Sequence, residues 1–209
     1  MKVLLVNGSP HKDGCTYTAL NEVAKELNKE GIETEIFWIG IKSISGCIAC
    51  YKCFKNGKCV FDDVVNVFAE KAKEADGFIF GTPVHYAAAS GLMTSFMDRL
   101  FYSTFTNQDI FRLKPAATVV SARRAGTTAT FEQLNKYYTM TQMPVISSRY
   151  WNMVHGTNPE EVKKDEEGMQ IMRILGKNMA YYLKCIDAGK KNGINPPEPE
   201  EISFTNFIR

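Results

Sequence analysis

The sequence predicts one α/β domain built on a doubly wound, five-stranded parallel sheet. Short, wholly apolar runs alternate along the chain with segments whose apolar residues recur at helical spacing, which is typical of strands buried on both faces. The 209 residues suit a single domain with an inserted loop, and 44% of them are hydrophobic, enough for a full core. Crossover connections in such sheets are right-handed, which favours the flavodoxin-like strand order 2-1-3-4-5.

End signals mark the first elements. Residues 2–6 form the first expected strand, and a long loop follows it. The next helix begins near Thr16, whose hydroxyl suits an N-cap, and ends at Gly31, which suits the position just past a helix. The remaining expected elements are strands over 32–39, 77–81, 116–121 and 145–147, and helices over 62–73, 90–101, 128–138 and 159–187.

A cysteine-rich stretch over residues 44–60 interrupts this alternation, and we expect it to be a loop insertion after the second strand. The domain is expected to span residues 1–188, with a C-terminal tail over 189–209. Large apolar residues gather near the end of the tail, namely Ile202, Phe204, Phe207 and Ile208. Because apolar side chains favour burial, we expect the tail to dock on this subunit or on a neighbouring one.

The charge balance excludes two classes of partner. Lys and Arg total 25 against 23 for Asp and Glu, a formal net charge of +2. A protein that binds nucleic acid or an anionic membrane would carry a clustered excess of basic residues. No apolar run approaches the ~20 residues that span a bilayer, and no signal-peptide pattern follows Met1. We therefore expect a cytoplasmic protein with reduced thiols, and neither nucleic acid nor membrane as a partner.

Three loops are expected to meet at the carboxyl edge of the sheet, where doubly wound folds bind their ligands. They cover residues 8–17, 82–90 and 121–127. Because each follows a predicted strand and precedes a helix, their polar groups converge on one rim. This rim is the expected ligand site.

The first loop suits a phosphate. It leads into a helix N-terminus, whose free N–H groups and dipole attract anions. The hydroxyls of Ser9, Thr16 and Tyr17 can add hydrogen bonds, and His11 can add charge. No Gly-Lys-Ser/Thr ending and no Gly-x-Gly-x-x-Gly occur, so neither a P-loop nor a tightly held dinucleotide is expected. A mononucleotide with one terminal phosphate fits better.

The other two loops suit a flat ring. The second loop carries polar backbone groups at a strand end and two rings that can stack on a ligand or border it; its candidate residues are Thr82, Pro83, Val84, His85 and Tyr86. The third loop contributes Ser121, Ala122, Arg123 and Gly126. An arginine beside the N1 and O2 edge of a flavin would stabilise the anionic reduced ring.

Together these motifs resemble the NADPH-dependent FMN reductase family, which has a flavodoxin-like fold. The resemblance is carried by Gly8-Ser9-Pro10 with Cys15-Thr16, by Gly81-Thr82-Pro83-Val84-His85-Tyr86 and by Ser121-Ala122-Arg123. It implies non-covalent FMN, with the phosphate held by the first loop, including Cys15, and the isoalloxazine bordered by residues 82–86 and 121–126. It also implies that the chemistry occurs at the flavin N5, without a catalytic side chain.

Four cysteines lie within 13 residues: Cys47, Cys50, Cys53 and Cys59. Such close spacing suits a cubane cluster, because each of its four irons needs one sulfur ligand. A zinc ion, or no metal at all, remains the alternative. The pattern resembles the cysteine motif of iron–sulfur flavoproteins, a branch of the same family that joins a 4Fe-4S cluster to FMN. Cys185 stands alone and is expected to be a packing residue.

The sequence therefore predicts an FMN-dependent electron-transfer oxidoreductase. A ferredoxin or NAD(P)H is the expected electron donor, and a small molecule the acceptor. The resemblance also implies a homodimer or homotetramer, with the cysteine loop near a neighbour's flavin. Two alternatives remain open. One is a cluster-free NAD(P)H-dependent flavin or quinone reductase, and the other is a zinc-stabilised interaction module without enzymatic activity.

Overall fold

A parallel sheet forms the centre of the computed structural model, which describes residues 1–107 and 110–207. The strands β1 (Lys2–Asn7), β2 (Glu33–Trp38), β3 (Gly77–His85), β5 (Ala116–Ala122) and β6 (Met153–His155) are arranged in the order β2-β1-β3-β5-β6. This is the predicted 2-1-3-4-5 order. A two-residue strand, β4 (Ala88–Ala89), pairs antiparallel with the end of β3.

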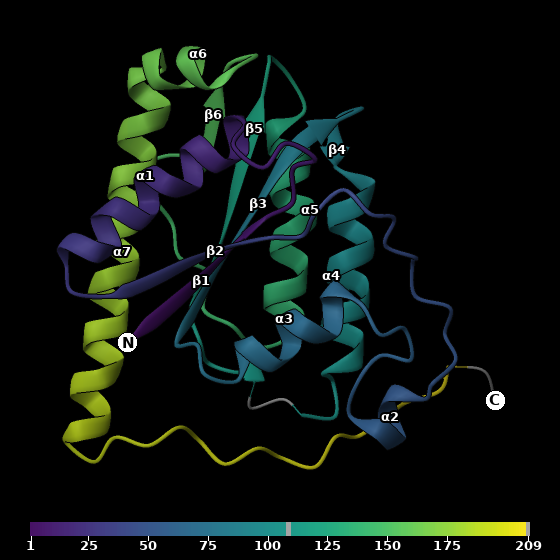
Figure 1. Ribbon diagram of the computed structural model, residues 1–209. Coiled ribbons are helices and arrows are strands. Elements are labelled where there is room, and N and C mark those ends of the chain that lie inside the picture. Colours follow the sequence, from purple (N-terminus) through teal and green to yellow (C-terminus); the bar gives the residue numbers. More distant parts are fainter. Residues whose placement is uncertain (108–109, 208–209) are drawn as a thin grey trace.

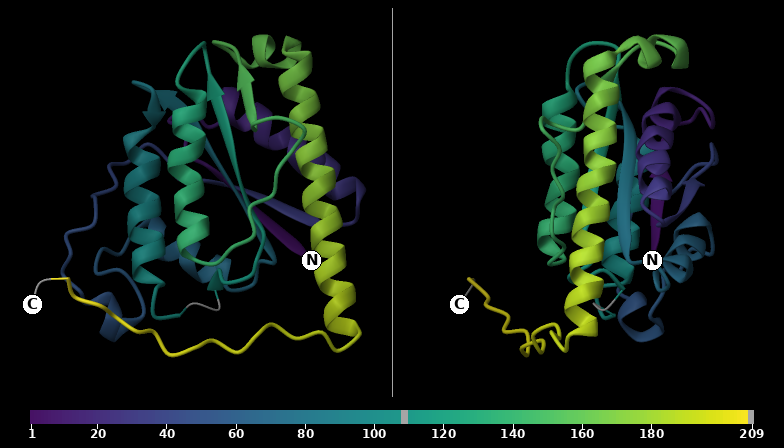
Figure 2. Two further views of the ribbon diagram at one scale, coloured as in Figure 1. Left: turned by 180° about the vertical axis from the view of Figure 1, so that it is seen from behind. Right: turned by 90° about the vertical axis from the view of Figure 1, so that its left-hand side faces the viewer.

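Helices cover both faces of the sheet (Figures 1 and 2). They are α1 (Cys15–Lys29), α2 (Cys53–Asn56), α3 (Val64–Ala72), α4 (Gly91–Ser103), α5 (Thr127–Met140), α6 (Pro159–Lys164) and α7 (Glu166–Lys191). Within the described part of the chain, no helix is long and apolar enough to cross a membrane. The cysteine-rich insertion follows β2, as predicted, and α2 is its short helical turn.

The two faces of the sheet belong to two cores. Phe78 and Phe80 of β3 pack with α3, α4 and α5, whereas Ile79 packs with α1 and α7. All three side chains are fully buried. Because the strands are apolar on both sides, polar groups concentrate at the strand ends.

The fifth strand was predicted over residues 145–147, and this position is wrong. Val145 makes only an isolated bridge to Ala116, and the paired strand β6 begins at Met153. The intervening segment leaves the ladder because it is polar at Ser147 to Arg149 and keeps its aromatic residues exposed. The edge strand is therefore interrupted, and its ordered part lies beside the end of β5.

The single helix predicted over 159–187 is two helices. The break falls at Asp165, whose carboxylate accepts a hydrogen bond from Gly168 N at 2.9 Å and so caps α7. The same carboxylate accepts from His155 N at 2.7 Å, which ties the start of α7 to the end of β6. Aspartate favours an N-cap because its side chain satisfies N–H groups that a helix start leaves free.

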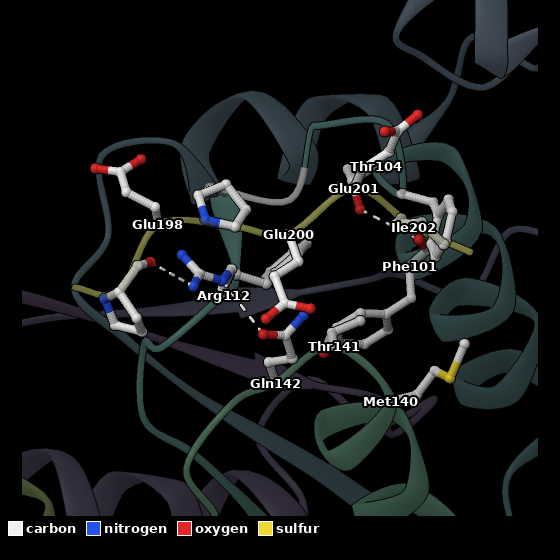
Figure 3. Close-up of a pocket in the computed structure, with 14 residues that line it drawn as sticks. Phe101, Thr104, Arg112, Met140, Thr141, Gln142, Glu198, Glu200, Glu201 and Ile202 are labelled. Atoms are coloured by element: carbon white, nitrogen blue, oxygen red, sulfur yellow. Dashed lines mark hydrogen bonds between the residues drawn. The ribbon is translucent and has the colours of Figure 1, made fainter.

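The C-terminal tail leaves α7 and runs along one end of the molecule, past the C-terminal ends of α4 and α5 (Figures 1 and 2). Arg112 Nη2 donates to Pro197 O at 2.7 Å, and residues 197–202 form one wall of a cavity of about 560 Å³ (Figure 3). Ile202, Phe204 and Phe207 remain 47%, 81% and 96% exposed, and Ile208 lies outside the described residues. Docking of the tail end on a neighbour stays a prediction.

The ion pairs of Glu35 on β2 allow a test of how much charge stabilises the edge of the sheet. Lys71 and Lys2 contact its carboxylate at 2.8 and 3.0 Å, and these two bonds lower the pKa of Glu35. A lowered carboxyl pKa adds stability above the unfolded pKa, and that contribution is lost as the pH falls through the folded value. Because the side chain is partly exposed, we expect Glu35→Gln to cost roughly 0.5 kcal/mol of unfolding free energy at neutral pH.

The measurement is urea unfolding of both proteins at neutral pH and at a series of lower pH values, where the difference should shrink as the carboxylate becomes protonated in the unfolded and then in the folded state. Glu74→Gln is the control, since Glu74 is exposed and no ion pair of the described residues includes it. A difference that persists unchanged in acid would contradict the role of the charge.

Candidate functional site

The first two predicted loops are held together at the carboxyl edge of the sheet. Gly8 N donates to Gly81 O at 2.8 Å, and Ser90 Oγ donates to Gly8 O at 3.1 Å. Ser90 also caps α4 by accepting from Met93 N at 3.3 Å. A Cβ on Gly8 would lie 2.9 Å from the backbone oxygen of Gly81, so only glycine allows this close approach. The loops after β1 and β3 therefore form one rim.

The third loop joins the same rim through buried hydroxyls. Thr16 Oγ1 and Ser121 Oγ lie 2.8 Å apart, and both residues are buried. Thr16 was predicted to be the N-cap of α1, and this is wrong. The helix begins at Cys15, and its N-cap is Gly14. The hydroxyl of Thr82 is likewise used inside the protein, since it accepts from Ser90 N at 3.2 Å. These hydroxyls fix the rim rather than face outward.

Two helices start at this rim without a side-chain cap. The N-caps of α1 and α5 are Gly14 and Gly126, and in the described part of the chain neither helix start donates an N–H hydrogen bond to a capping side chain. The other helices of more than five residues are capped by Asp63, Ser90, Asn158 and Asp165. An uncapped helix start presents backbone N–H groups and positive dipole charge, which suits the phosphate of FMN.

The loop after β1 has a defined shape. Buried Asn7 accepts from Ser9 N at 3.1 Å and donates to Lys12 O at 2.9 Å. Ser9 Oγ accepts from His11 N at 3.1 Å, and His11 itself is exposed. Trp38 Nε1 donates to Ser9 O at 2.8 Å. The sequence analysis missed Asn7 and Trp38, although a polar residue that ends a wholly apolar strand was a usable signal for Asn7.

A cavity of about 560 Å³ opens beside this loop. Its lining residues are Pro10 to Cys15, Trp38, Ile41, and Thr157 to Pro159. Cys15 Sγ donates to Gly156 O at 3.7 Å, and burial raises the pKa of its thiol, which favours the neutral form. Tyr17 lies on the first turn of α1 and is half-buried. Residues 157–159, which follow β6, thus line this cavity in addition to the loop after β1, and the sequence analysis had not assigned them to the site.

The tip of the second loop has a strained backbone. Tyr86 and Ala87 have φ angles of +50° and +60°, a region that side chains other than glycine adopt rarely. Tyr86 and His85 are exposed, whereas Pro83 and Val84 are half-buried. Strain of this kind persists where the surroundings impose it, and it is concentrated at ligand sites.

The third loop meets this tip at Gly126. Its φ is +91°, and a Cβ there would lie 2.6 Å from Ala87 Cα, so the two backbones touch. Ala122 is buried at the end of β5, while Arg123 is exposed. Arg123 follows the end of β5 on this loop, and its contact with a ligand stays a prediction. The structure thus brings the three predicted loops together.

The cysteine-rich insertion forms a second candidate site. Its four cysteines line one small pocket, together with apolar side chains and Arg99. Cys47 and Cys50 are exposed and Cys53 is buried. Two residues between the cysteines have left-handed backbones, Ala49 with φ +49° and Tyr51 with φ +57°. These turns bring successive cysteines to the same pocket.

Asn66 and Arg99 hold the end of the insertion in place. The amide of Asn66 accepts from Cys59 N at 3.0 Å and donates to Cys59 O at 3.0 Å. Arg99, 1% exposed, donates from Nε to Cys59 Sγ at 3.2 Å and forms two bonds to Asp63. The sequence analysis missed Arg99, although a charged residue beside the buried stripe of Phe96 and Leu100 was a signal.

The donor set suits an iron–sulfur cluster in its chemistry, because four thiols share one largely apolar pocket. In the described part of the chain, no three His, Cys, Asp or Glu side chains are placed as a ligand group for a metal ion. Burial raises the pKa of Cys53, which favours its protonated thiol. A cluster would therefore have to draw the thiols together and deprotonate Cys53.

The two sites lie at opposite ends of α4. Ser90, the N-cap of this helix, belongs to the rim, whereas Tyr102 and Ser103 near its other end line the cysteine pocket. A helix of 13 residues is about 20 Å long. Figure 1 shows α2 at the end of the molecule away from β4. Within one chain, the rim and the cysteine pocket are therefore separated by the length of α4.

Comparisons with known proteins identify the family of the chain. Residues 1–158 match the family model described as NADPH-dependent FMN reductase. An iron–sulfur flavoprotein of Methanocaldococcus jannaschii is 32% identical over 191 residues, which cover 89% of this chain and 99% of that protein. An iron–sulfur flavoprotein of Archaeoglobus fulgidus is 29% identical over 190 residues, covering 87% and 97%.

Solved structures share the fold. A structure of RosB with a bound riboflavin-phosphate intermediate superposes with a TM-score of 0.68 at 14% identity, covering 100% of this chain and 94% of that chain. A flavodoxin from the domain Archaea gives a TM-score of 0.59 at 15% identity, covering 88% and 99%. The predicted flavodoxin-like fold is confirmed.

The contact at Gly126 generates a test of the rim. A methyl group in Gly126→Ala would meet the backbone of Ala87 and oppose a φ of +91°, so the second and third loops must separate. We expect the dissociation constant for FMN to rise about tenfold or more, since strained left-handed positions cost roughly 1–3 kcal/mol.

The measurement is a flavin fluorescence titration of the apoprotein. Gly193→Ala is the matched control, because Gly193 also has a positive φ but an added Cβ would meet nothing within 4 Å. Equal losses of FMN affinity in both variants would show that the contact with Ala87 is unimportant.

Proposed function

This chain belongs to the NADPH-dependent FMN reductase family and is a flavin-dependent oxidoreductase; from this premise we propose that it is an iron–sulfur flavoprotein that passes electrons from a protein or nicotinamide donor to a small-molecule acceptor. The observation that carries the proposal is the presence, on one chain, of the three-loop rim and of a pocket lined by four cysteines. Because the family is one of flavin reductases, we no longer retain the alternative of a zinc-stabilised interaction module without enzymatic activity.

FMN supplies, when bound, the exchange between hydride and single-electron chemistry. The chain's part is to bind and orient it. The free N–H groups at the start of α1, with Ser9 beside them, suit the phosphate. Residues 82–86 and 121–126 suit the two sides of the ring, and Arg123 suits its pyrimidine edge. The buried bond between Thr16 and Ser121 keeps these loops at a fixed spacing.

A 4Fe-4S cluster held by Cys47, Cys50, Cys53 and Cys59 would supply single-electron transfer at the other end of α4. About 20 Å of helix between the two sites argues against direct transfer within one chain. A homodimer or homotetramer that places the insertion near a neighbour's flavin would shorten this path. Exposed aromatic side chains on the insertion, Tyr51 and Phe54, support such an interface.

The charge of the insertion supports a protein as the electron donor. Residues 41–61 contain four lysines and neither aspartate nor glutamate; the lysines are Lys42, Lys52, Lys55 and Lys58. All four are exposed. A basic surface around the cysteine pocket would steer an acidic electron carrier of the ferredoxin type toward it. NAD(P)H would instead deliver its hydride at the rim.

A cluster-free NAD(P)H-dependent flavin or quinone reductase is the second candidate. It is favoured by the arrangement of the cysteines, because the described residues place no three His, Cys, Asp or Glu side chains as a ligand group for a metal ion. In this case the rim would carry the whole reaction, and the cysteines would have no part in it.

Cofactor content tests the two candidates. After anaerobic purification we expect yellow protein with one FMN and about four iron and four sulfide per chain. Cys50→Ser should lose the iron and sulfide while it retains FMN, because the two sites are separate. Cys185→Ser is the control and should keep both cofactors. Protein with full FMN but without iron and sulfide would establish the cluster-free reductase, and protein unable to bind FMN would contradict both candidates.

Charge reversal tests the donor. We expect the double variant Lys52→Glu and Lys55→Glu to be reduced at least about tenfold more slowly by an acidic ferredoxin at low salt, since attraction becomes repulsion. Its reduction by NADPH should not change. The control carries Lys190→Glu and Lys191→Glu at the end of α7 and makes the same change in net charge. Stopped-flow traces of flavin absorbance provide the measurement, and equal rates in both double variants would rule out docking at the insertion.

A further inference from the structure

Arg99 is a buried charged side chain whose hydrogen bonds within the described part of the chain all go to the cysteine-rich insertion and the residues just after it, and none goes to the rim. The residue is 1% exposed, although its guanidinium carries a positive charge. Burial of an unpaired charge is costly, so such a group persists only where hydrogen bonds and an opposite charge compensate it. Arg99 lies on α4, and the groups that compensate it all come from the cysteine-rich insertion and the residues that follow it.

Each of the five donors of the guanidinium has an acceptor. Nε donates to Cys59 Sγ at 3.2 Å. Nη1 donates to Asp63 Oδ2 at 2.7 Å and to Ser45 O at 3.4 Å, and Nη2 donates to Asp63 Oδ1 at 2.9 Å and to Phe61 O at 3.3 Å. An arginine has five N–H groups in a fixed fork, so none is left over. The ring of Phe61 adds a cation–π contact, with its centroid 4.8 Å from Cζ.

These acceptors lie on both sides of the cysteine run. Ser45 precedes Cys47, whereas Phe61 and Asp63 follow Cys59. One rigid group thus closes the loop by holding its two ends together and, at the same time, contacts the sulfur of its last cysteine. Lysine could not replace it, because its ammonium has three donors and no planar fork.

We propose that Arg99 is the positioning residue of the cysteine pocket: its fork closes the loop over residues 45–63 and orients the Cys59 sulfur. The part of this proposal that concerns the bound cluster rests on the proposed function, whereas loop closure does not. With a cluster present, the Nε–H bond and the positive charge would stabilise the more negative, reduced form. Arg99 would then raise the reduction potential of the cluster.

Asp63→Asn is the most informative variant. Asp63 also caps α3 by accepting from Val65 N at 3.1 Å, and asparagine caps helices equally well. The substitution therefore removes the counter-charge of Arg99 and one acceptor without removing the cap. Arg99→Lys keeps the charge and loses the fork. Arg149→Lys is the control, because Arg149 forms an exposed ion pair with Glu167 at 2.8 Å.

Hydrogen exchange with mass spectrometry tests loop closure in the full-length protein, both loaded and cluster-free. In the cluster-free protein we expect Asp63→Asn and Arg99→Lys to speed amide exchange over residues 45–61 about tenfold or more, since each variant loses charge-assisted hydrogen bonds that oppose local opening. Peptides from β3 and α5 should exchange as in the wild type. Unchanged exchange over 45–61 in Asp63→Asn would overturn the proposal, and so would acceleration spread over the whole chain.

A redox titration monitored by electron paramagnetic resonance tests the contact with Cys59. In loaded protein we expect Arg99→Lys to lower the midpoint potential of the cluster and to change its spectrum, while FMN content stays at the wild-type level. A wild-type potential and spectrum in Arg99→Lys would overturn the role at Cys59. If the wild-type protein holds no iron and sulfide, the proposed cluster fails, and the exchange experiment still decides loop closure.

Discussion

Burial of the parallel sheet on both faces is the constraint on which the rest of the structure depends. Phe78 and Phe80 face one helical layer and Ile79 faces the other, so β3 has no polar side within the core. Unpaired polar groups inside such a sheet would be costly. Hydrogen-bonding and charged groups therefore gather where the strands end, and the carboxyl edge becomes the place where three loops can hold one ligand.

The alternation of apolar strands and amphipathic helices was sufficient to predict the strand order and the rim, because both follow from local periodicity and from the handedness of crossovers. The fifth strand was not predictable in this way. Val145 has the composition of a strand, yet pairing depends on which residues lie beside β5, and the polar run from Ser147 leaves the ladder before Met153 resumes it. The break at Asp165 was not predictable for a similar reason. The apolar spacing is continuous across it, and a single capping carboxylate divides the segment into two helices.

The candidate site shows the same limit at the level of side chains. Thr16, Thr82 and Ser121 were predicted to belong to the cofactor site, and their hydroxyls have partners inside the protein: Thr16 bonds Ser121 across two loops, and Thr82 accepts from Ser90 N within one loop. A hydroxyl satisfies an internal partner as readily as a ligand, and only the fold decides between them. At Gly126 the fold alone explains the residue type, because the backbone contact with Ala87 leaves no space for any side chain.

The insertion depends on a residue that its own sequence does not contain. The cysteine spacing indicates a ligand group, but the loop has few buried apolar side chains to hold it in one shape, and Ile48, Tyr51 and Phe54 are exposed. Its closure is supplied by Arg99 from α4, the helix whose N-cap Ser90 also bonds the rim at Gly8. Because a helix is stiff along its axis, this single element fixes the rim and the cysteine pocket relative to one another. A movement of the cysteine-rich insertion is therefore transmitted to α4 through Arg99, although the rim and the cysteine pocket share no side chain.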